Sequence, residues 1–373
     1  MTTPRFHYRP PDFGVAPLSD APDATFAPMI ADGVLPEGFF STTNLPTYLR
    51  IGGTWRRPRS PRMDCVIVMD AEGQLTAREP RRLTQGTPVA LGEAEDGSQG
   101  IYVHTEGFLG GSRSANEFQF MATAVSRERP VDYQQLAEQL AEERTGGGHI
   151  VWVAGPALVH SRARSDMTWF IENGYVQAFL GGNAIAVHDL EAALFGTTLG
   201  MTAEGESVAY GHGLHMRAIN AIRRAGSIDE AVRSGLVTNG IMHALVRHGV
   251  PYVLAGSIRD DGPLPGVITD VLAAQDAMRE QTTRATFAVL VATALHAIAV
   301  GNMLPAYVDQ GGDRLRPLPT ICVDQTEFVV NKLRDRGTHQ AHGVVTNAQD
   351  FMHVLRFYIE RWEQAPGRRV RRG

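Results

Sequence analysis

The stretch HIVWVAGPALVH, residues 149–160, decides how the rest of the chain is interpreted. Its first part, residues 149–154, is an almost continuous apolar run, which is typical of a strand that is buried on both faces of a parallel sheet. Gly155 and Pro156 end the run, because glycine and proline favour turns. Five further runs follow it along the chain, and the complete set is 149–154, 175–180, 252–255, 287–292, 320–323 and 343–345.

Amphipathic segments of helix length separate these runs. Examples are LHMRAINAIRRAG at 214–226, VITDVLAAQDAMREQ at 267–281 and AQDFMHVLRFYIERW at 348–362. Alternation of apolar strands with helices predicts an α/β fold, with a largely parallel sheet covered by helices on both faces. We assign residues 131–365 to this domain. It begins with the helical pattern VDYQQLAEQLAEER at 131–144, which three consecutive glycines end.

The preceding part of the chain has a different pattern. Residues 34–130 contain short runs with many β-branched residues between turn signals, among them TYLRIGG at 47–53 and GIYVHTE at 100–106. They predict a smaller β-rich (α+β) domain. Residues 1–33 show no periodicity, so we expect an N-terminal arm on which the fold does not depend. Residues 366–373 are expected to form a basic, solvated tail.

Composition narrows the class of protein. The 373 residues carry a net charge of -5 and are 43% hydrophobic, which is typical of a soluble globular protein and disfavours nucleic acid as a partner. The longest apolar run, 285–300, is too short to cross a membrane. Cys65 and Cys322 suggest no disulfide framework and are expected in the core. Since the N-terminus lacks the apolar stretch of a signal peptide, we expect the protein in a reducing cytoplasm.

Small and polar residues follow every apolar run. In an open α/β sheet, ligands bind beyond the carboxyl ends of the strands, so six such ends together predict one shared crevice. A nucleotide suits it, because glycines and helix N-termini let backbone N–H groups approach a pyrophosphate. The sequence has no GxGxxG motif. The residues concerned are Gly155–Ala157, Gly181–Ala184, Gly256–Gly262, Thr293–His296, Asp324 and Thr346–Ala348.

Two acidic positions in these segments allow two interpretations each. Asp324 either binds ribose hydroxyls, which would favour NAD over NADP, or caps a helix that starts near Glu327. Arg259, Asp260 and Asp261 precede Gly-Pro-Leu-Pro and lie on a loop of restricted conformation. They either bind the carboxylate and ammonium of an amino acid or pair with one another.

The 13 histidines raise the question of a metal site. His212 and His215 lie close in sequence, and His188 adjoins Asp189, but no HExxH or cysteine-rich spacing accompanies them, so we expect no metal. His160 and His296 lie near strand ends and are better candidates for proton transfer in the crevice.

Several long motifs together resemble the archaeal-type ornithine cyclodeaminases, which carry a LOR/SDH domain and also form the C-terminal part of cyanobacterial arginine dihydrolase/ornithine cyclodeaminase fusions. The resemblance runs from about residue 35 to residue 355. It implies a Rossmann-like domain behind the β-rich LOR/SDH-type domain. The motifs are LPEGFFSTTN at 35–44, MDCVIV at 63–68, GPALVH at 155–160, GNAIAVHD at 182–189, FGTTLGM at 195–201, AGSIRDDGPLP at 255–265 and HAIAVGNMLP at 296–305.

The resemblance also implies NAD contacts. By motif these fall on Asn183, Ala184, Asp261, Thr293, Ala294, Leu295, His296, Asp324, Asn347 and Ala348. Two features depart from the family pattern. Family members typically have Asp-Val where this chain has Asn347-Ala348, and the segment 306–321 is longer than expected.

The activity implied is the NAD-dependent conversion of L-ornithine to L-proline with loss of ammonia, by hydride transfer to the cofactor and back. Such a reaction needs groups that bind the amines and carboxylate and groups that move protons. The candidates are Asp260 or Asp261, Arg259, and His160 or His296. Three alternatives stay open: the same chemistry on another diamino acid, such as lysine to pipecolate; an NAD-binding sensor without catalysis; and an ordinary oxidoreductase. A homo-oligomer is expected because most soluble enzymes associate symmetrically.

Overall fold

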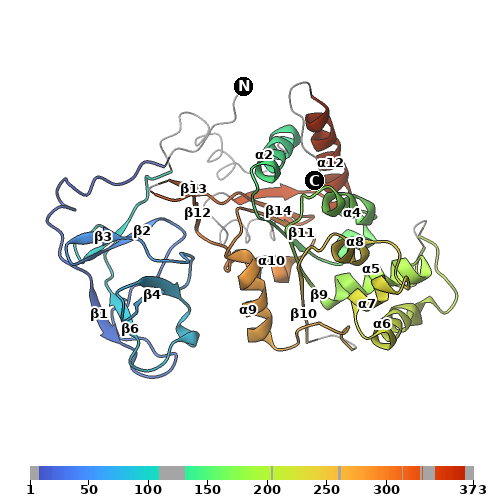
Figure 1. The fold of residues 1–373 in the computed structure, drawn as a ribbon, viewed down its shortest axis with the longest axis horizontal. Coiled ribbons are helices and arrows are strands. Elements are labelled where there is room, and N and C mark those ends of the chain that lie inside the picture. Colours follow the sequence, from blue (N-terminus) through green and yellow to red (C-terminus); the bar gives the residue numbers. More distant parts are fainter. Residues whose placement is uncertain are drawn as a thin grey trace. The chain divides into compact units, whose positions relative to one another are not determined.

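The chain forms two compact units in a computed structural model that describes residues 8–108, 131–202, 205–258, 262–312, 314–327, 330 and 341–365. The first unit comprises 1–129, 302–318 and 337–340, and the second comprises 130–301, 319–336 and 341–373 (Figure 1). The predicted boundary near residue 130 stays a prediction. The excursion of 302–318 into the first unit lies within the range that was expected to form one domain.

The second unit is built on a sheet of six strands in the order β10-β9-β8-β11-β14-β15, and all its strand pairs are parallel. Numbered along the chain, this order is 3-2-1-4-5-6, the arrangement of dinucleotide-binding Rossmann folds. The predicted α/β fold and all six predicted strands are confirmed. The strands are β8 (Ile150–Ala154), β9 (Ala178–Gly182), β10 (Tyr252–Ala255), β11 (Phe287–Val291), β14 (Thr320–Asp324) and β15 (Ala341–Val345).

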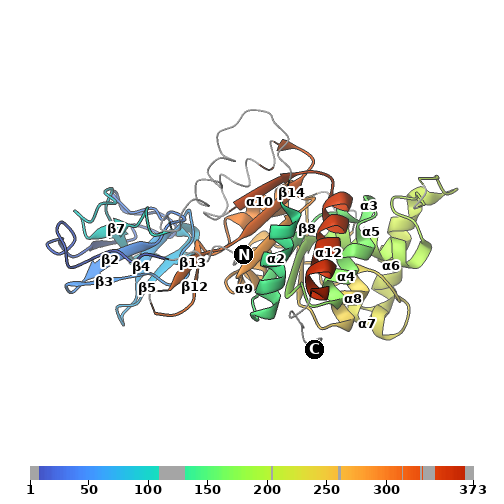
Figure 2. The same cartoon turned by 90° about the horizontal axis from the view of Figure 1, so that it is seen from above.

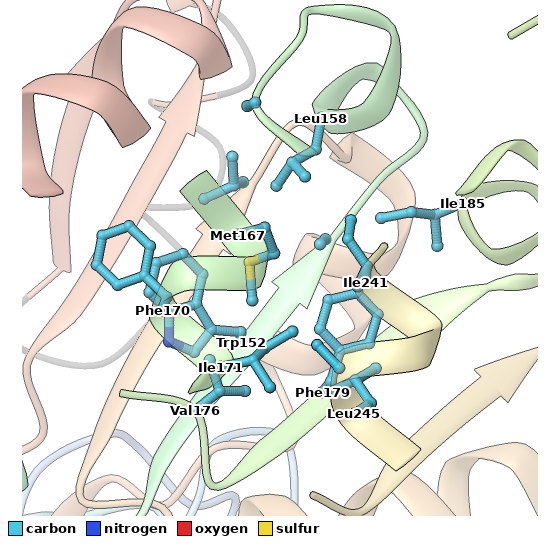
Figure 3. Close-up of a cluster of buried hydrophobic side chains, with 14 of the residues drawn as sticks. Trp152, Leu158, Met167, Phe170, Ile171, Val176, Phe179, Ile185, Ile241 and Leu245 are labelled. Atoms are coloured by element: carbon cyan, nitrogen blue, oxygen red, sulfur yellow. The ribbon is translucent and has the colours of Figure 1, made fainter. Parts of the chain in front are cut away.

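Helices pack on this sheet around one large apolar core. Every residue of β8 is buried, and Trp152 lies against Phe170 with 5.0 Å between ring centroids (Figure 3). The helices are α2 (Tyr133–Thr145), α3 (Ala157–His160), α4 (Arg164–Glu172), α5 (Asn183–Phe195), η2 (Gly211–Gly213), α6 (Leu214–Ala225), α7 (Ile228–Arg233), α8 (Ile241–Arg247), α9 (Val271–Thr282), α10 (Ala294–Gly301) and α12 (Ala348–Gln364).

The first and last helices of the second unit pack side by side. Figures 1 and 2 both show α2 beside α12, and Arg144 of α2 pairs with Glu363 of α12 at 2.6 Å. As predicted, α2 ends where the glycines begin, with Gly146 as its C-cap.

The first unit is antiparallel and rich in β structure. Its sheets have the strand orders β1-β6-β4-β5 and β3-β2-β7, and β12 pairs with β13. The elements are β1 (Thr25–Pro28), β2 (Thr47–Ile51), β3 (Thr54–Arg56), β4 (Val66–Met69), β5 (Leu75–Arg78), η1 (Pro80–Arg82), β6 (Pro88–Leu91), β7 (Ile101–Val103), β12 (Tyr307–Asp309) and β13 (Leu315–Pro317).

Two segments far apart in the sequence complete this unit, one from residues 18–28 and one from residues 302–318. β1 comes from the expected arm and pairs with β6, and Leu18 is buried, so residues 18–28 take part in the fold. From the excursion, Ala306 donates its N–H to the carbonyl of Pro61 at 2.8 Å, and Arg57 pairs with Asp309 at 3.4 Å.

Both cysteines lie in the core, as predicted. Cys65 and Cys322 are buried, and burial raises the pKa of the Cys322 thiol to about 12. A thiol with such a pKa is a poor nucleophile at neutral pH. None of the helices among the described residues combines the length and apolarity that a bilayer crossing requires.

Candidate functional site

The two central strands of the sheet, β8 and β11, run side by side and lead into α3 and α10. In this strand order the connections diverge from the sheet centre, which leaves room for a ligand between the first and fourth strands. A Cβ atom on Gly155 would lie 2.1 Å from the carbonyl oxygen of Ala292. Ala292 itself has a φ of 58°, which is uncommon outside glycine. The two backbones therefore meet at a spacing that only glycine at position 155 permits.

Across β8, the end of β9 meets the start of α10. A Cβ on Gly182 would lie 2.6 Å from Cε1 of His296, so the imidazole lies directly over this glycine backbone. His296 is half-buried. The ends of three neighbouring strands thus lie close together at Gly155, Gly182 and His296, and one crevice framed by all six strand ends stays a prediction.

The first turn of α5 follows Gly182, and no side chain caps it there. Ala184 is exposed in this turn, whereas Asn183 is buried. The carboxamide oxygen of Asn183 accepts the N–H of Leu264 at 3.0 Å and so holds the loop that follows β10. The N–H groups of an uncapped first helical turn suit an anion. Cofactor contacts by Asn183 and Ala184 stay a prediction.

The acidic loop after β10 lies outside the described residues, and this includes Arg259, Asp260 and Asp261. The basic tail 366–373 does so as well. On the described flank of the loop, Arg223 of α6 donates to the carbonyl of Pro263 at 3.0 Å. The roles assigned to the three charged residues remain predictions.

Asp324 and Asn347 occupy the ends of β14 and the start of α12. One oxygen of Asp324 accepts both the N–H and the hydroxyl of Thr326, at 2.9 and 2.7 Å, which forms a local turn. Asn347 is the N-cap of α12, because its oxygen accepts the N–H of Asp350 at 2.8 Å. Asparagine and aspartate cap helices equally well. The departure from the family's Asp-Val therefore preserves this helix start, and the cofactor contacts of Asp324, Asn347 and Ala348 stay predictions.

His160 ends α3 and contacts a second histidine. Its ring centroid lies 4.5 Å from that of His188, with 60° between the planes. Burial, and then the charge of His188, lower the pKa of His160, whereas Glu191 opposes this shift. A neutral imidazole can accept a proton, which fits the predicted role of His160.

Asp189 has a structural task. It is fully buried, accepts Nε–H of Arg164 at 2.6 Å, and accepts the N–H groups of Ile241 and Met242 at the start of α8. His212 lies exposed in η2, while His215 belongs to α6. Within the described ranges, no group of three or more His, Cys, Asp or Glu side chains is arranged to hold a metal ion.

Sequence reasoning missed Glu191. This side chain is fully buried on α5 and lies 3.6 Å from Nδ1 of His188. A signal was present, because Asp189 and Glu191 interrupt a helix that is otherwise apolar on most of its faces. Carboxylates in such a helix are buried and therefore need partners.

Comparison with known proteins identifies relatives across nearly the whole chain. Residues 134–355 match the family described as arginine dihydrolase ArgZ-like, C-terminal, Rossmann fold, and residues 46–134 match the first region of the same C-terminal part. An ornithine cyclodeaminase from Methanopyrus kandleri is 43% identical over 347 residues, which cover 92% of this chain and 80% of that protein.

Solved structures show the same architecture. A LOR/SDH protein from Methanococcus maripaludis superposes with a TM-score of 0.80 at 38% identity and covers 93% of this chain and 100% of the other. The ternary complex of AgrE with ornithine and NAD+ superposes with a TM-score of 0.56 at 36% identity and covers 92% of this chain and 46% of AgrE.

Proposed function

Because the chain belongs to the archaeal-type ornithine cyclodeaminase family, we propose that it converts L-ornithine to L-proline and ammonia with NAD. Members of this family are related to the C-terminal part of ArgZ-like arginine dihydrolases. The relative AgrE has been crystallised with ornithine and NAD+. The convergence of three strand ends at Gly155, Gly182 and His296 carries the proposal for this chain.

The residues at these strand ends fit a dinucleotide. Side chains at positions 155 and 182 would fill the space into which backbone and the ring of His296 now fit. The close approach that these glycines allow lies beside the uncapped first turn of α5, and the N–H groups of such a turn suit the phosphates of a dinucleotide. NAD, when bound, accepts a hydride from the substrate α-carbon and returns it within the same turnover.

The protein supplies binding, orientation and proton transfer. We assign the substrate carboxylate to Arg259 and its amines to Asp260 or Asp261, because these charges match those of a diamino acid. His160 or His296 takes a proton from a substrate ammonium, so that the neutral amine can react, and returns it to the departing ammonia. Replacement of either imidazole is expected to slow this exchange.

The direct test is incubation of the purified protein with L-ornithine and a catalytic amount of NAD. Proline and ammonia should form in equal amounts and well in excess of the NAD added, with no accumulation of NADH absorbance, because the cofactor is regenerated. Lysine and other diamino acids serve as alternative substrates in the same assay. Accumulating NADH would identify an ordinary oxidoreductase. NAD binding without turnover of any diamino acid would identify a sensor and reject the proposal.

A further inference from the structure

Glu191 is a buried negative charge with an unusually complete set of donors. One oxygen accepts the hydroxyl of Thr197 at 3.0 Å and the N–H of Gly200 at 2.9 Å, and the other accepts the N–H of Leu199 at 3.1 Å. Burial raises the pKa of this carboxyl, but the interaction with His188 and the hydrogen bonds from these donors outweigh burial and hold the pKa below its usual value. Glu191 therefore keeps its charge at neutral pH.

His188 lies one helical turn before Glu191 and faces this charge. Its Nδ1 is 3.6 Å from a carboxylate oxygen, and its side chain is 13% exposed. This separation is longer than an ordinary hydrogen bond, so the interaction is mainly electrostatic. A fixed anion on this side attracts the Nδ1 edge of the ring and so orients the imidazole of His188.

The ring of His188 also contacts His160. His188 therefore lies between the buried Glu191 of α5 and the exposed His160 at the end of α3. Two imidazoles with centroids 4.5 Å apart repel each other when both are protonated. In the described part of the chain α12 also packs against α3, and its His353 and Arg356 pair instead with Asp166 at 3.8 and 3.2 Å. Among the described residues, His188 and Glu191 are thus the ionisable groups that act on His160.

We infer that His188 and Glu191 are positioning residues, which hold His160 in the orientation and protonation state of a proton acceptor beside the strand ends. The inference rests on the proposed function, in which a proton passes from a substrate ammonium nitrogen to a ring nitrogen of His160. That transfer leaves a neutral amine and an imidazolium, and the imidazolium gives its proton to the departing ammonia. Neither positioning residue needs to touch the substrate.

The inference is tested by titrating His160 in the full chain, by NMR of protein with ¹⁵N-labelled histidine, without substrate. His160→Gln identifies the signal. In His188→Asn the pKa of His160 should rise, because the neighbouring charge and part of the burial are lost. His353→Asn is the matched control, since it removes an imidazole beside another carboxylate, and should leave the titration of His160 unchanged. His188→Gln gives a second variant should the asparagine variant not fold.

Kinetics supply the second measurement. In His188→Asn, kcat/KM for ornithine should fall roughly 10- to 100-fold, which is the scale expected for a misplaced reacting group. The acidic limb of the pH profile of kcat/KM should move to higher pH, because the pKa of His160 rises. An unchanged titration of His160, or an equal shift in the His353 control, overturns the inference. Because the titration needs no turnover, a chain that does not act on ornithine but shows the shift refutes the proposed function while leaving the coupling of the histidines in place.

Discussion

At the residue scale, Gly182 offers a test of the part played by His296. Replacing Gly182 with alanine should displace the imidazole, because the new methyl group would lie 2.6 Å from its Cε1. The obstacle is a side chain and not backbone, so the ring can move and the fold should survive. We expect kcat/KM for ornithine to fall about tenfold or more, with little change in melting temperature. Steady-state kinetics and a thermal melt measure both.

Gly213→Ala is the matched control for this substitution. Gly213 has a φ of -91°, and a Cβ there would meet nothing within 4 Å. Gly213→Ala should therefore leave kcat/KM unchanged. If Gly182→Ala is as active as this control, His296 has no role that depends on its present position.

At the element scale, α8 depends on a side chain from α5. Asp189 is fully buried, accepts two N–H groups at the start of α8, and pairs with Arg164, whose side chain is 22% exposed. Its replacement by alanine should lower the free energy of unfolding by about 3 kcal/mol, because two helix N–H groups and a cation lose their acceptor. Urea denaturation followed by circular dichroism measures the loss.

An exposed cap provides the comparison. Asp270 caps α9 through the N–H of Ala273 at 2.7 Å, and its alanine variant should cost only about 1 kcal/mol. Equal losses for Asp189→Ala and Asp270→Ala would show that burial adds nothing to the cap of α8.

The elements of the sheet were predictable, but the contacts between them were not. A strand buried on both faces has an apolar residue at every position, so β8 and β11 were visible as continuous runs. By contrast, the meeting of Gly155 with Ala292 depends on which strands become neighbours. Three partners of Glu191, namely Thr197, Leu199 and Gly200, lie on a turn whose path the sequence does not specify.

At the scale of the whole molecule, stability should depend on pH through buried histidines. Burial lowers the pKa of His342 to about 4, against an ordinary value of 6.5. As the pH falls below 6.5 the unfolded chain binds this proton first, so the free energy of unfolding decreases until about pH 4. Between pH 6.5 and pH 4 this difference in pKa should lower the free energy of unfolding by about 3 kcal/mol, and above pH 6.5 none of this stability is lost.

Urea denaturation at a series of pH values measures this effect. His342→Gln removes the titrating group, and the variant should lose less stability than the parent between pH 6.5 and 4. His248→Gln changes an exposed histidine and should follow the parent. Parallel curves for the parent and the His342 variant would contradict the assignment.

The place of residues 302–318 in the first unit lay beyond the sequence. The hairpin of β12 and β13 comes from a segment that reads as a long insertion, yet Arg57 and Pro61 bind it within the first unit. Its partners are about 250 residues away along the chain, and a local pattern carries no information at that distance.

The helix α10 connects His296 to the segment that belongs to the first unit. His296 lies in its first turn, and Gly301 at its other end leads directly to Asn302. Asn302 belongs to the first unit, and its carboxamide donates to Asp64 of the same unit at 3.4 Å. Eight helical residues span about 12 Å and hardly stretch. The chain therefore enters the first unit one residue beyond the end of the helix that carries His296.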